Sequence, residues 1–263
     1  MRIFLASIIA IVYLDAAVYY AKVEPKERYI IKAATSGAIK EAAISKEGKV
    51  LKESVIVQLD DALNRVEMER SIQKLASLKS MRQATKENIA NLEAIADVNE
   101  KQYERIKDLK TKSQIAKEAE YISLINAKNQ VVSARSSLHN LENQITDITF
   151  KIESLEDTIT KKRIKVEKGL LYSLHVKPDD YVNIGAVLAE VHDISEGKLT
   201  VFLSLEDKLL MDKKMLYLDD EPLQAVEYKV WPVADANHIS SYKTEIHIQA
   251  PKTFSKLVKV EWK

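Results

Sequence analysis

The 263-residue sequence contains no cysteine. Structural disulfides, thiolate metal sites and a cysteine nucleophile are therefore excluded, and so is a lipid anchor attached through cysteine. The formal net charge is +1, with acidic and basic residues interspersed along the chain. No basic stretch rich in aromatic residues is present, so the sequence gives no reason to expect nucleic acid as a partner.

Glycine and proline are also scarce. There are five of each, and none lies between Lys49 and Lys168. Globular domains normally place these residues at their turns. A stretch that lacks both over this length, and is rich in Lys, Glu, Ala, Leu and Gln, indicates very long helices.

The second half of this stretch has apolar residues at an unbroken 3-4 spacing. A 3.5-residue repeat keeps one stripe facing a partner helix, as in a left-handed coiled coil. We therefore predict that these residues form a coiled-coil seam. They are Leu124, Ala127, Val131, Ala134, Leu138, Leu141, Ile145, Ile148, Ile152, Leu155 and Ile159.

The first half has a similar but more polar 3-4 pattern, and the short polar segment Lys110–Ser113 separates the two halves. Equal arms joined by a short loop favour one antiparallel hairpin over residues 62–162, with arms 62–109 and 114–162. A dimer of separate helices is the alternative. The predicted seam of the first arm is Leu78, Met81, Thr85, Asn88, Leu92, Ile95, Asn99, Gln102, Ile106 and Leu109.

The regions that flank the hairpin repeat each other. Ser36–Leu59 aligns with Lys168–Val191 without a gap, at a constant offset of 132 residues. Apolar positions match in the alternating pattern of short strands, and only Glu53, opposite Gly185, departs from the expected turn chemistry. Each half is too small to bury its own core, so we expect the two halves to pack together as a β-sandwich.

The last part of the chain is β-rich as well. Short apolar runs separated by charged or proline-containing connections predict a small barrel or open sheet over residues 195–263. The expected strands are Leu199–Leu205, Leu223–Val230, Thr244–Gln249 and Leu257–Trp262.

The N-terminus has the features of an export signal. Met1 and Arg2 precede an apolar run, Ile3–Leu14, followed by Asp15. Residues 1–21 are predicted to be either a cleaved signal peptide or a retained membrane anchor, and both alternatives export the rest of the chain. A buried core helix is the third interpretation.

No catalytic motif is evident. The five histidines lack ligand spacing, and the sequence has neither a glycine-rich phosphate loop nor a Gly-x-Ser-x-Gly elbow. We therefore expect no enzyme, no metal and no cofactor. The histidines are His139, His175, His192, His238 and His247.

The flanking halves resemble the two parts of a split biotinyl/lipoyl-like domain. The first resembling segment is Ser36–Val57 and the second, which matches more fully, is Gly169–Leu188. Two such halves around a helical hairpin are similar to periplasmic adaptor proteins, the membrane fusion proteins of the HlyD type.

This resemblance implies an elongated multidomain α+β fold. The expected fold is a split biotinyl/lipoyl-like β-sandwich with an inserted antiparallel α-helical coiled-coil hairpin, followed by a small β-barrel. The expected segments are the signal peptide or anchor at 1–21, the lipoyl-like halves at 30–61 and 163–194, the hairpin at 62–162 and the barrel-like domain at 195–263.

The resemblance also implies a function. Such a protein would be a periplasmic adaptor that links an inner-membrane transporter of the ABC, RND or MFS type to a TolC-like outer-membrane channel for efflux or secretion. It would form a homo-oligomeric ring, a trimer or hexamer. Its N-terminal segment would anchor it in the inner membrane if that segment is retained.

The family's tip motif marks the expected channel contact. Many members carry Arg, then Leu four residues on, then Ser seven residues further. Here Arg105 and Leu109 match, while Ala116 stands at the serine position. Two alternatives to the adaptor are a structural coiled-coil tether of the envelope and a carrier of biotin or lipoate.

Overall fold

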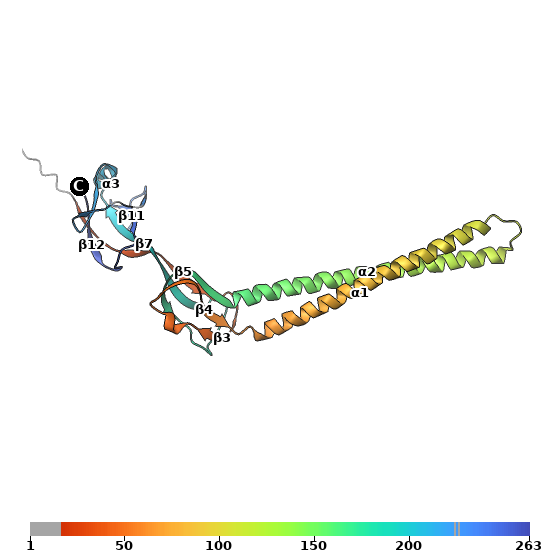
Figure 1. Ribbon diagram of the computed structural model, residues 1–263. Helices are drawn as coiled ribbons and strands as arrows, with labels where there is room; N and C mark the ends of the chain where they lie inside the picture. The colour runs from red at the N-terminus through yellow and green to blue at the C-terminus, as the bar shows by residue number, and fades with distance from the viewer. Residues whose placement is uncertain (1–16, 224, 226) are drawn as a thin grey trace, which may run out of the picture. The chain divides into compact units, whose positions relative to one another are not determined.

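The computed structural model describes residues 17–223, 225 and 227–263 of the chain (Figure 1). It comprises two compact units. The hairpin unit contains Ala34–Lys40 and Gln58–Ile164, and the β unit contains Glu41–Val57, Lys165–Lys263 and the described residues before Ala34. The mixture of helix and sheet, with one long helical hairpin and sheet-rich parts, confirms the predicted α+β class.

The hairpin consists of α1 (Ala62–Ile106) and α2 (Gln114–Lys161). Both helices begin at the predicted residues, but α1 ends earlier than predicted, so the tip loop is longer. Ser113 caps α2, because its hydroxyl accepts a hydrogen bond from the backbone N–H of Ala116. Figure 1 shows the two helices side by side and crossing along their length.

The seam of α2 is as predicted, since all eleven residues are buried or half-buried. Leu141 and Ile148 form a buried cluster with Leu78 of α1. Closer to the tip, Ala127 and Val131 form another with Ala96.

The predicted seam of α1 is partly wrong. Met81, Asn88, Ile95 and Gln102 are exposed, and the residue after each of them faces α2 instead. A 3-4 and a 4-3 spacing share every seventh residue, here Leu78, Thr85, Leu92, Asn99 and Ile106, and differ only in the position between. The structure has the 4-3 spacing. The four residues that take the place of the predicted ones are Arg82, Ile89, Ala96 and Tyr103.

Backbone and side-chain hydrogen bonds close the base of the hairpin. The N–H of Leu59 donates to the carbonyl of Lys162 at 2.9 Å. The Lys162 ammonium donates to the carbonyl of Asp60 at 2.8 Å and to Oδ1 of Asn64 at 2.6 Å. These bonds join the first turn of α1 to the residue that ends α2, so the two helices start in a fixed register.

Asp61 precedes α1 and is buried, in contrast to most carboxylates of the hairpin. Its Oδ2 accepts a hydrogen bond from Nε of Arg65 at 2.8 Å. This interaction holds the pKa of the Asp61 carboxyl below its usual value, against the opposing effect of burial. The ionised carboxylate therefore stabilises the folded hairpin above the pKa of an unfolded Asp, and this contribution is lost as the pH falls through the lowered pKa.

The remaining secondary structure is almost entirely strands, arranged in two sheets. One sheet has the order β1-β12-β8-β9, and the other has the order β10-β11-β7-β5-β4-β3-β6, with β2 also paired to β7. The strands are β1 (Val18–Lys22), β2 (Glu24–Lys32), β3 (Gly37–Ala42), β4 (Val50–Leu59), β5 (Arg163–Leu174), β6 (Tyr181–Val182), β7 (Val187–Leu203), β8 (Leu216–Leu218), β9 (Glu221–Pro222), β10 (Glu227–Val230), β11 (Tyr242–Gln249) and β12 (Leu257–Trp262).

β7 is the longest strand and runs through position 194, where the sequence analysis places a domain boundary. Its first part pairs with β2 and β5, and its last part pairs with β11. The expected strand Leu199–Leu205 is therefore the end of a longer one. A short helix, α3 (Leu205–Leu210), follows it directly, because the Ser204 hydroxyl caps the N–H of Asp207.

The predicted internal repeat is matched in burial at some aligned positions but not at others. Ile44 is 46% exposed, whereas the aligned Val176 is 6% exposed, and Val50 is 62% exposed, whereas the aligned Val182 is 6% exposed. Ile39 and Leu171, which align at the offset of 132, are both fully buried, as are Ile56 and Leu188. The backbone conformation also repeats at the turn where Glu53 aligns with Gly185. Glu53 has φ +46° and the aligned Gly185 has φ +83°, so a glutamate adopts the left-handed conformation that the second half gives to glycine.

The N-terminal segment contributes a strand that the sequence analysis did not anticipate. β1 pairs antiparallel with β12, and Ala21 and Val23 lie in the same buried cluster as Leu199, Val260 and other apolar residues of the C-terminal part. The predicted signal or anchor at 1–21 lies outside the described residues as far as residue 16. Among the described residues, no helix is both long and apolar enough to span a bilayer.

Two isoleucine substitutions test the observed seam of α1. Ile89 is 8% exposed and Ile95 is 50% exposed. We expect Ile89→Ala to lower the free energy of unfolding by about 2–4 kcal/mol, since it leaves a cavity in the seam. Ile95→Ala should change it by less than about 0.5 kcal/mol. Urea unfolding followed by circular dichroism at the helical minimum measures both, and a larger effect at Ile95 would restore the originally predicted spacing.

A second pair of substitutions tests the strained turn in the repeat. Glu53→Gly should stabilise the protein by about 0.5–1 kcal/mol, because relief of a left-handed conformation outweighs the added entropy of the unfolded chain. Glu53→Ala keeps the strain and should stay close to wild type. Gly185→Ala should cost about 1 kcal/mol for backbone reasons alone, since no heavy atom lies within 4 Å of the added Cβ. Thermal unfolding compares the three variants. A Glu53→Gly protein less stable than wild type would show that the backbone at Glu53 is not strained.

Candidate functional interface on the hairpin

An aromatic pair closes the tip of the hairpin. The rings of Tyr103 on α1 and Tyr121 on α2 lie 5.4 Å apart at an angle of 50°. Beside them, a cavity of about 300 Å³ is lined by polar and charged side chains, among them Lys107 and Gln114. Lys107 also pairs with Glu104, which raises the pKa of the Lys107 ammonium above its ordinary value. The tip is thus a packed turn with a polar surface.

The three residues predicted to contact a channel differ in exposure. Arg105 is exposed in the last turn of α1, where its positive charge is favourable for the helix dipole. Leu109 is 44% exposed in the tip loop, so it is not a seam residue. Ala116 is half-buried, and its backbone N–H donates a hydrogen bond to the Ser113 hydroxyl. The structure therefore presents Arg105 and Leu109 to solvent and turns Ala116 partly inward.

Arg105 and Leu109 belong to a longer exposed stripe on α1, which we call the α1 stripe. Its members within α1 are each one residue before a seam position, and Leu109 continues the same spacing into the tip loop. No member before Arg105 is charged, although the helix is rich in Lys and Glu. Sequence analysis missed this stripe because it assigned Met81 and Ile95 to the seam. The α1 stripe consists of Met81, Ala84, Asn88, Asn91, Ile95, Val98, Gln102, Arg105 and Leu109.

α2 has a second exposed stripe near the tip. The α2 stripe is formed by Ile115, Ile122, Ile125 and Val132, of which Ile115 is 79% exposed. Ile125 and Val132 each follow a seam residue directly, so they point away from α1. The signal was present in the sequence, as apolar residues 7, 3 and 7 positions apart that remain once the seam is assigned.

The α2 stripe lies at the same level as the part of the α1 stripe nearer the tip. Asn99 of α1 donates from Nδ2 to the carbonyl of Ser123 at 3.5 Å, and Lys128 of α2 pairs with Glu100 at 2.7 Å. Val98 is therefore level with the segment that carries Ile122 and Ile125. The α1 stripe extends farther toward the base, since Met81 lies close to Leu78, which packs with Leu141 of α2.

The stripes face opposite sides of the hairpin. Each residue along a helix rotates the side chain by about 100°. The α1 stripe precedes its seam by one residue, whereas Ile125 and Val132 follow theirs by one. Because α1 and α2 run antiparallel, these opposite offsets turn the two stripes to opposite faces. The α1 stripe therefore lies on one face of the hairpin, and the α2 stripe lies on the opposite face.

Charged side chains lie along the hairpin on either side of the seam. Pairs such as Glu67 with Lys151, and Glu93 with Arg135, bridge the two helices beside the seam. Exposed pairs of this kind contribute little to stability but disfavour a shifted register. Within the described part of the chain, no group of three or more His, Asp or Glu side chains is placed to hold a metal ion. The geometry is suited to contact with other helices.

No protein-family model matches the sequence, and comparison with curated proteins finds no relative. Solved structures do match. The membrane fusion protein Spr0693 from Streptococcus pneumoniae R6 superposes with a TM-score of 0.62 at 10% identity, over 93% of this chain and 99% of that one. The chain is also similar to MacA from Actinobacillus actinomycetemcomitans, with a TM-score of 0.56 at 15% identity, over 94% of this chain and 78% of that one.

A third match concerns a chimeric protein. It is a MacA–MexA chimera that contains the α-hairpin domain of Pseudomonas aeruginosa MexA. The TM-score is 0.58 at 14% identity, over 94% of this chain and 80% of that one. At these identities the likeness concerns the fold. It covers nearly the whole chain in each case, so the hairpin and the β-rich parts occur in the same combination.

Proposed function

This chain has the fold of the membrane fusion proteins, and we propose that it is a periplasmic adaptor that links an inner-membrane transporter to a TolC-like outer-membrane channel. The observation that carries the proposal is the pair of stripes on opposite faces of the hairpin, which contain no charged residue apart from Arg105 and overlap in level near the tip. The transporter would be of the ABC, RND or MFS type. The protein would act by shape and conformational coupling, with no chemical step of its own.

The β-rich parts fit this proposal. We assign the two repeats, which flank the hairpin in sequence, to a split lipoyl-like domain, supported by the matching burial of Ile39 with Leu171 and Ile56 with Leu188. The cluster around Leu199 and Val260 would be the core of the barrel-like domain. Export to the periplasm follows from the predicted signal or anchor at 1–21.

The stripes would serve assembly of a homo-oligomeric ring. A contact between unlike faces is heterologous, and it closes into a ring when the rotation between neighbours is suitable. The α1 stripe of one copy would pack against the α2 stripe of the next. Neutral side chains such as Val98 and Ile122 suit this contact because their burial requires no desolvation of charge.

The tip would contact the outer-membrane channel through Arg105 and Leu109. The Arg105 guanidinium offers several donors for carbonyl groups of a partner helix, and Leu109 offers apolar surface. Ala116, the third position of the family motif, would contribute less because its side chain is half-buried. Ile115, the neighbouring residue, is a stronger candidate at 79% exposed.

Paired substitutions on α1 test the ring. Ile95 and Ile72 are 50% and 48% exposed on the same helix, but only Ile95 belongs to the α1 stripe. We expect Ile95→Glu to shift the oligomer to monomer in analytical ultracentrifugation at a concentration where Ile72→Glu remains assembled. Circular dichroism should show unchanged helicity in both. Equal assembly of the two variants, or a wild-type protein that stays monomeric, would contradict the proposed contact.

Crosslinking in cells tests the tip, using the absence of native cysteine. Lys112→Cys in the tip loop should capture an outer-membrane protein with a bifunctional reagent, whereas Lys74→Cys in the basal half should not. Adding Arg105→Ala and Leu109→Ala should reduce the capture by roughly tenfold. A structural tether would give no channel adduct from either cysteine, so mass spectrometry of the adduct separates the two functions.

A further inference from the structure

A cavity in the β unit has no part in the proposed adaptor contacts. Its volume is about 510 Å³, and charged and apolar side chains line it together. This volume is typical of sites for small organic ligands. The lining residues come from β1, β2, β5, β7 and the loop before β12, so several strands must fold before the cavity exists.

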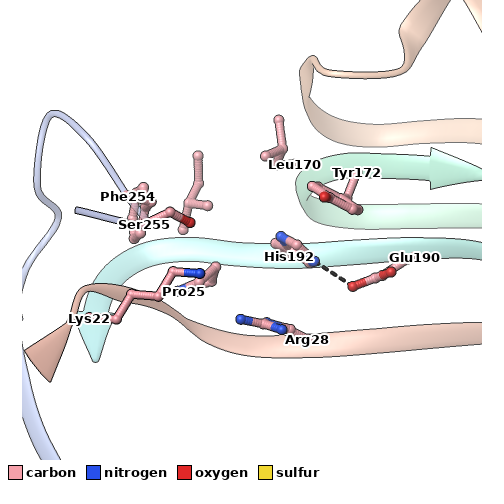
Figure 2. A pocket seen from close by; sticks show the side chains of 10 residues that line it. Lys22, Pro25, Arg28, Leu170, Tyr172, Glu190, His192, Phe254 and Ser255 are labelled. Atoms are coloured by element: carbon pink, nitrogen blue, oxygen red, sulfur yellow. Dashed lines mark hydrogen bonds and ion pairs between the residues drawn. The ribbon is translucent and has the colours of Figure 1, made fainter. Parts of the chain in front are cut away.

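Strand register brings three of the lining residues onto one face. Arg28 of β2 lies directly opposite His192 of β7, and Leu170 of β5 lies opposite the same histidine on the other side. Residues directly opposite each other on neighbouring strands share a face of the sheet. Figure 2 shows His192 in the middle of the site, with Arg28 and Tyr172 on either side of it.

His192 is held rigidly. Its side chain is 9% exposed, and Nε2 lies 2.7 Å from Oε1 of Glu190. The ring stacks on Tyr172 at 4.4 Å and 17°. Among the described residues, the other ring nitrogen, Nδ1, has no hydrogen-bond partner. A fixed imidazole with one free nitrogen in a cavity is suited to contact a ligand.

The other end of the cavity is built from β1 and the loop that contains Phe254. The loop is fastened to β1, since Ser255 N–H donates to the Val23 carbonyl at 2.7 Å and Val23 N–H donates to the Lys256 carbonyl at 2.9 Å. Ser255 has φ +64°, a strained conformation for serine. These bonds fix Phe254 in the cavity wall close to Lys22 (Figure 2).

We propose that this cavity binds a small aromatic anion, a carboxylate or phosphate ester on a flat ring. Lys22 and Arg28 supply two cations, of which Arg28 also pairs through one terminal nitrogen with Glu24 at 3.0 Å. Glu190 is the only acidic residue in the lining and is engaged by His192. The apolar walls, which include Leu170 and Phe254, suit the ring. The anionic group would be bound by Lys22 and by the N–H groups of Arg28 that Glu24 does not use.

Isothermal titration calorimetry of the purified exported chain tests this proposal, with benzoate and phenyl phosphate as probes and benzyl alcohol as the neutral control. We expect saturable binding of the two anions at submillimolar to millimolar concentration, with benzyl alcohol at least about tenfold weaker. The double variant Lys22→Gln/Arg28→Gln should weaken anion binding by more than about tenfold. Lys26→Gln is the matched control, because Lys26 lies on the same strand as Arg28 but outside the lining.

Three outcomes would overturn the proposal. They are the absence of saturable binding by either anion up to about 10 mM, equal binding of benzyl alcohol, and an equal loss of affinity in Lys26→Gln. Circular dichroism of each variant confirms that the fold is retained. The measurement needs neither a ring nor a channel, so its result is independent of the proposed adaptor function.

Discussion

The rest of the hairpin depends on one constraint, which is that each helix can bury only a single stripe against the other. In α2 this stripe is occupied without interruption by apolar residues from Leu124 to Ile159. In α1 the seam includes Arg82, Thr85 and Asn99, while Met81, Ile95 and Val98 are left in solvent. Exposed apolar residues of this kind, aligned along one side of a helix, indicate an unused surface.

Register turns this local constraint into a property of the whole hairpin. The bonds of Lys162 to Asp60 and Asn64 set the two helices at the base. Ion pairs farther along, such as Glu100 with Lys128, fit only one alignment. A shift of α1 by one heptad against α2 would change which residues of the two stripes lie at the same level. The base of the hairpin therefore controls whether a surface near the tip can meet its counterpart on a neighbour.

The sequence was sufficient to predict features that repeat over many residues. The hairpin, its starting residues, the α2 seam and the flanking repeat all have signals that accumulate along the chain. The phase of the α1 seam could not be fixed in this way, since Leu78 and Leu92 belong to both possible spacings. Its polar positions gave no preference, and only packing against the apolar α2 stripe decided between them.

Features made by long-range pairing were outside the reach of local pattern. β1 becomes a strand because β12, more than 200 residues later in the chain, offers it a partner, and its apolar residues were instead assigned to an export segment. α3 begins at a serine cap inside what resembled a strand. The cavity around His192 likewise depends on the register of β2, β5 and β7, and no spacing in the sequence brings Arg28 and Leu170 to the same histidine.

The distribution of charge explains why the two candidate surfaces differ in chemistry. The net charge of the chain is only +1, so attraction between whole molecules contributes little to either contact. On the hairpin, specificity has to come from neutral stripes that exclude charge at one level, because burying any of the flanking Lys or Glu residues would be unfavourable. In the β unit the lining is different, since Lys22 and Arg28 line the same cavity together with apolar side chains. The two candidate surfaces thus differ in charge and lie in different units of the fold.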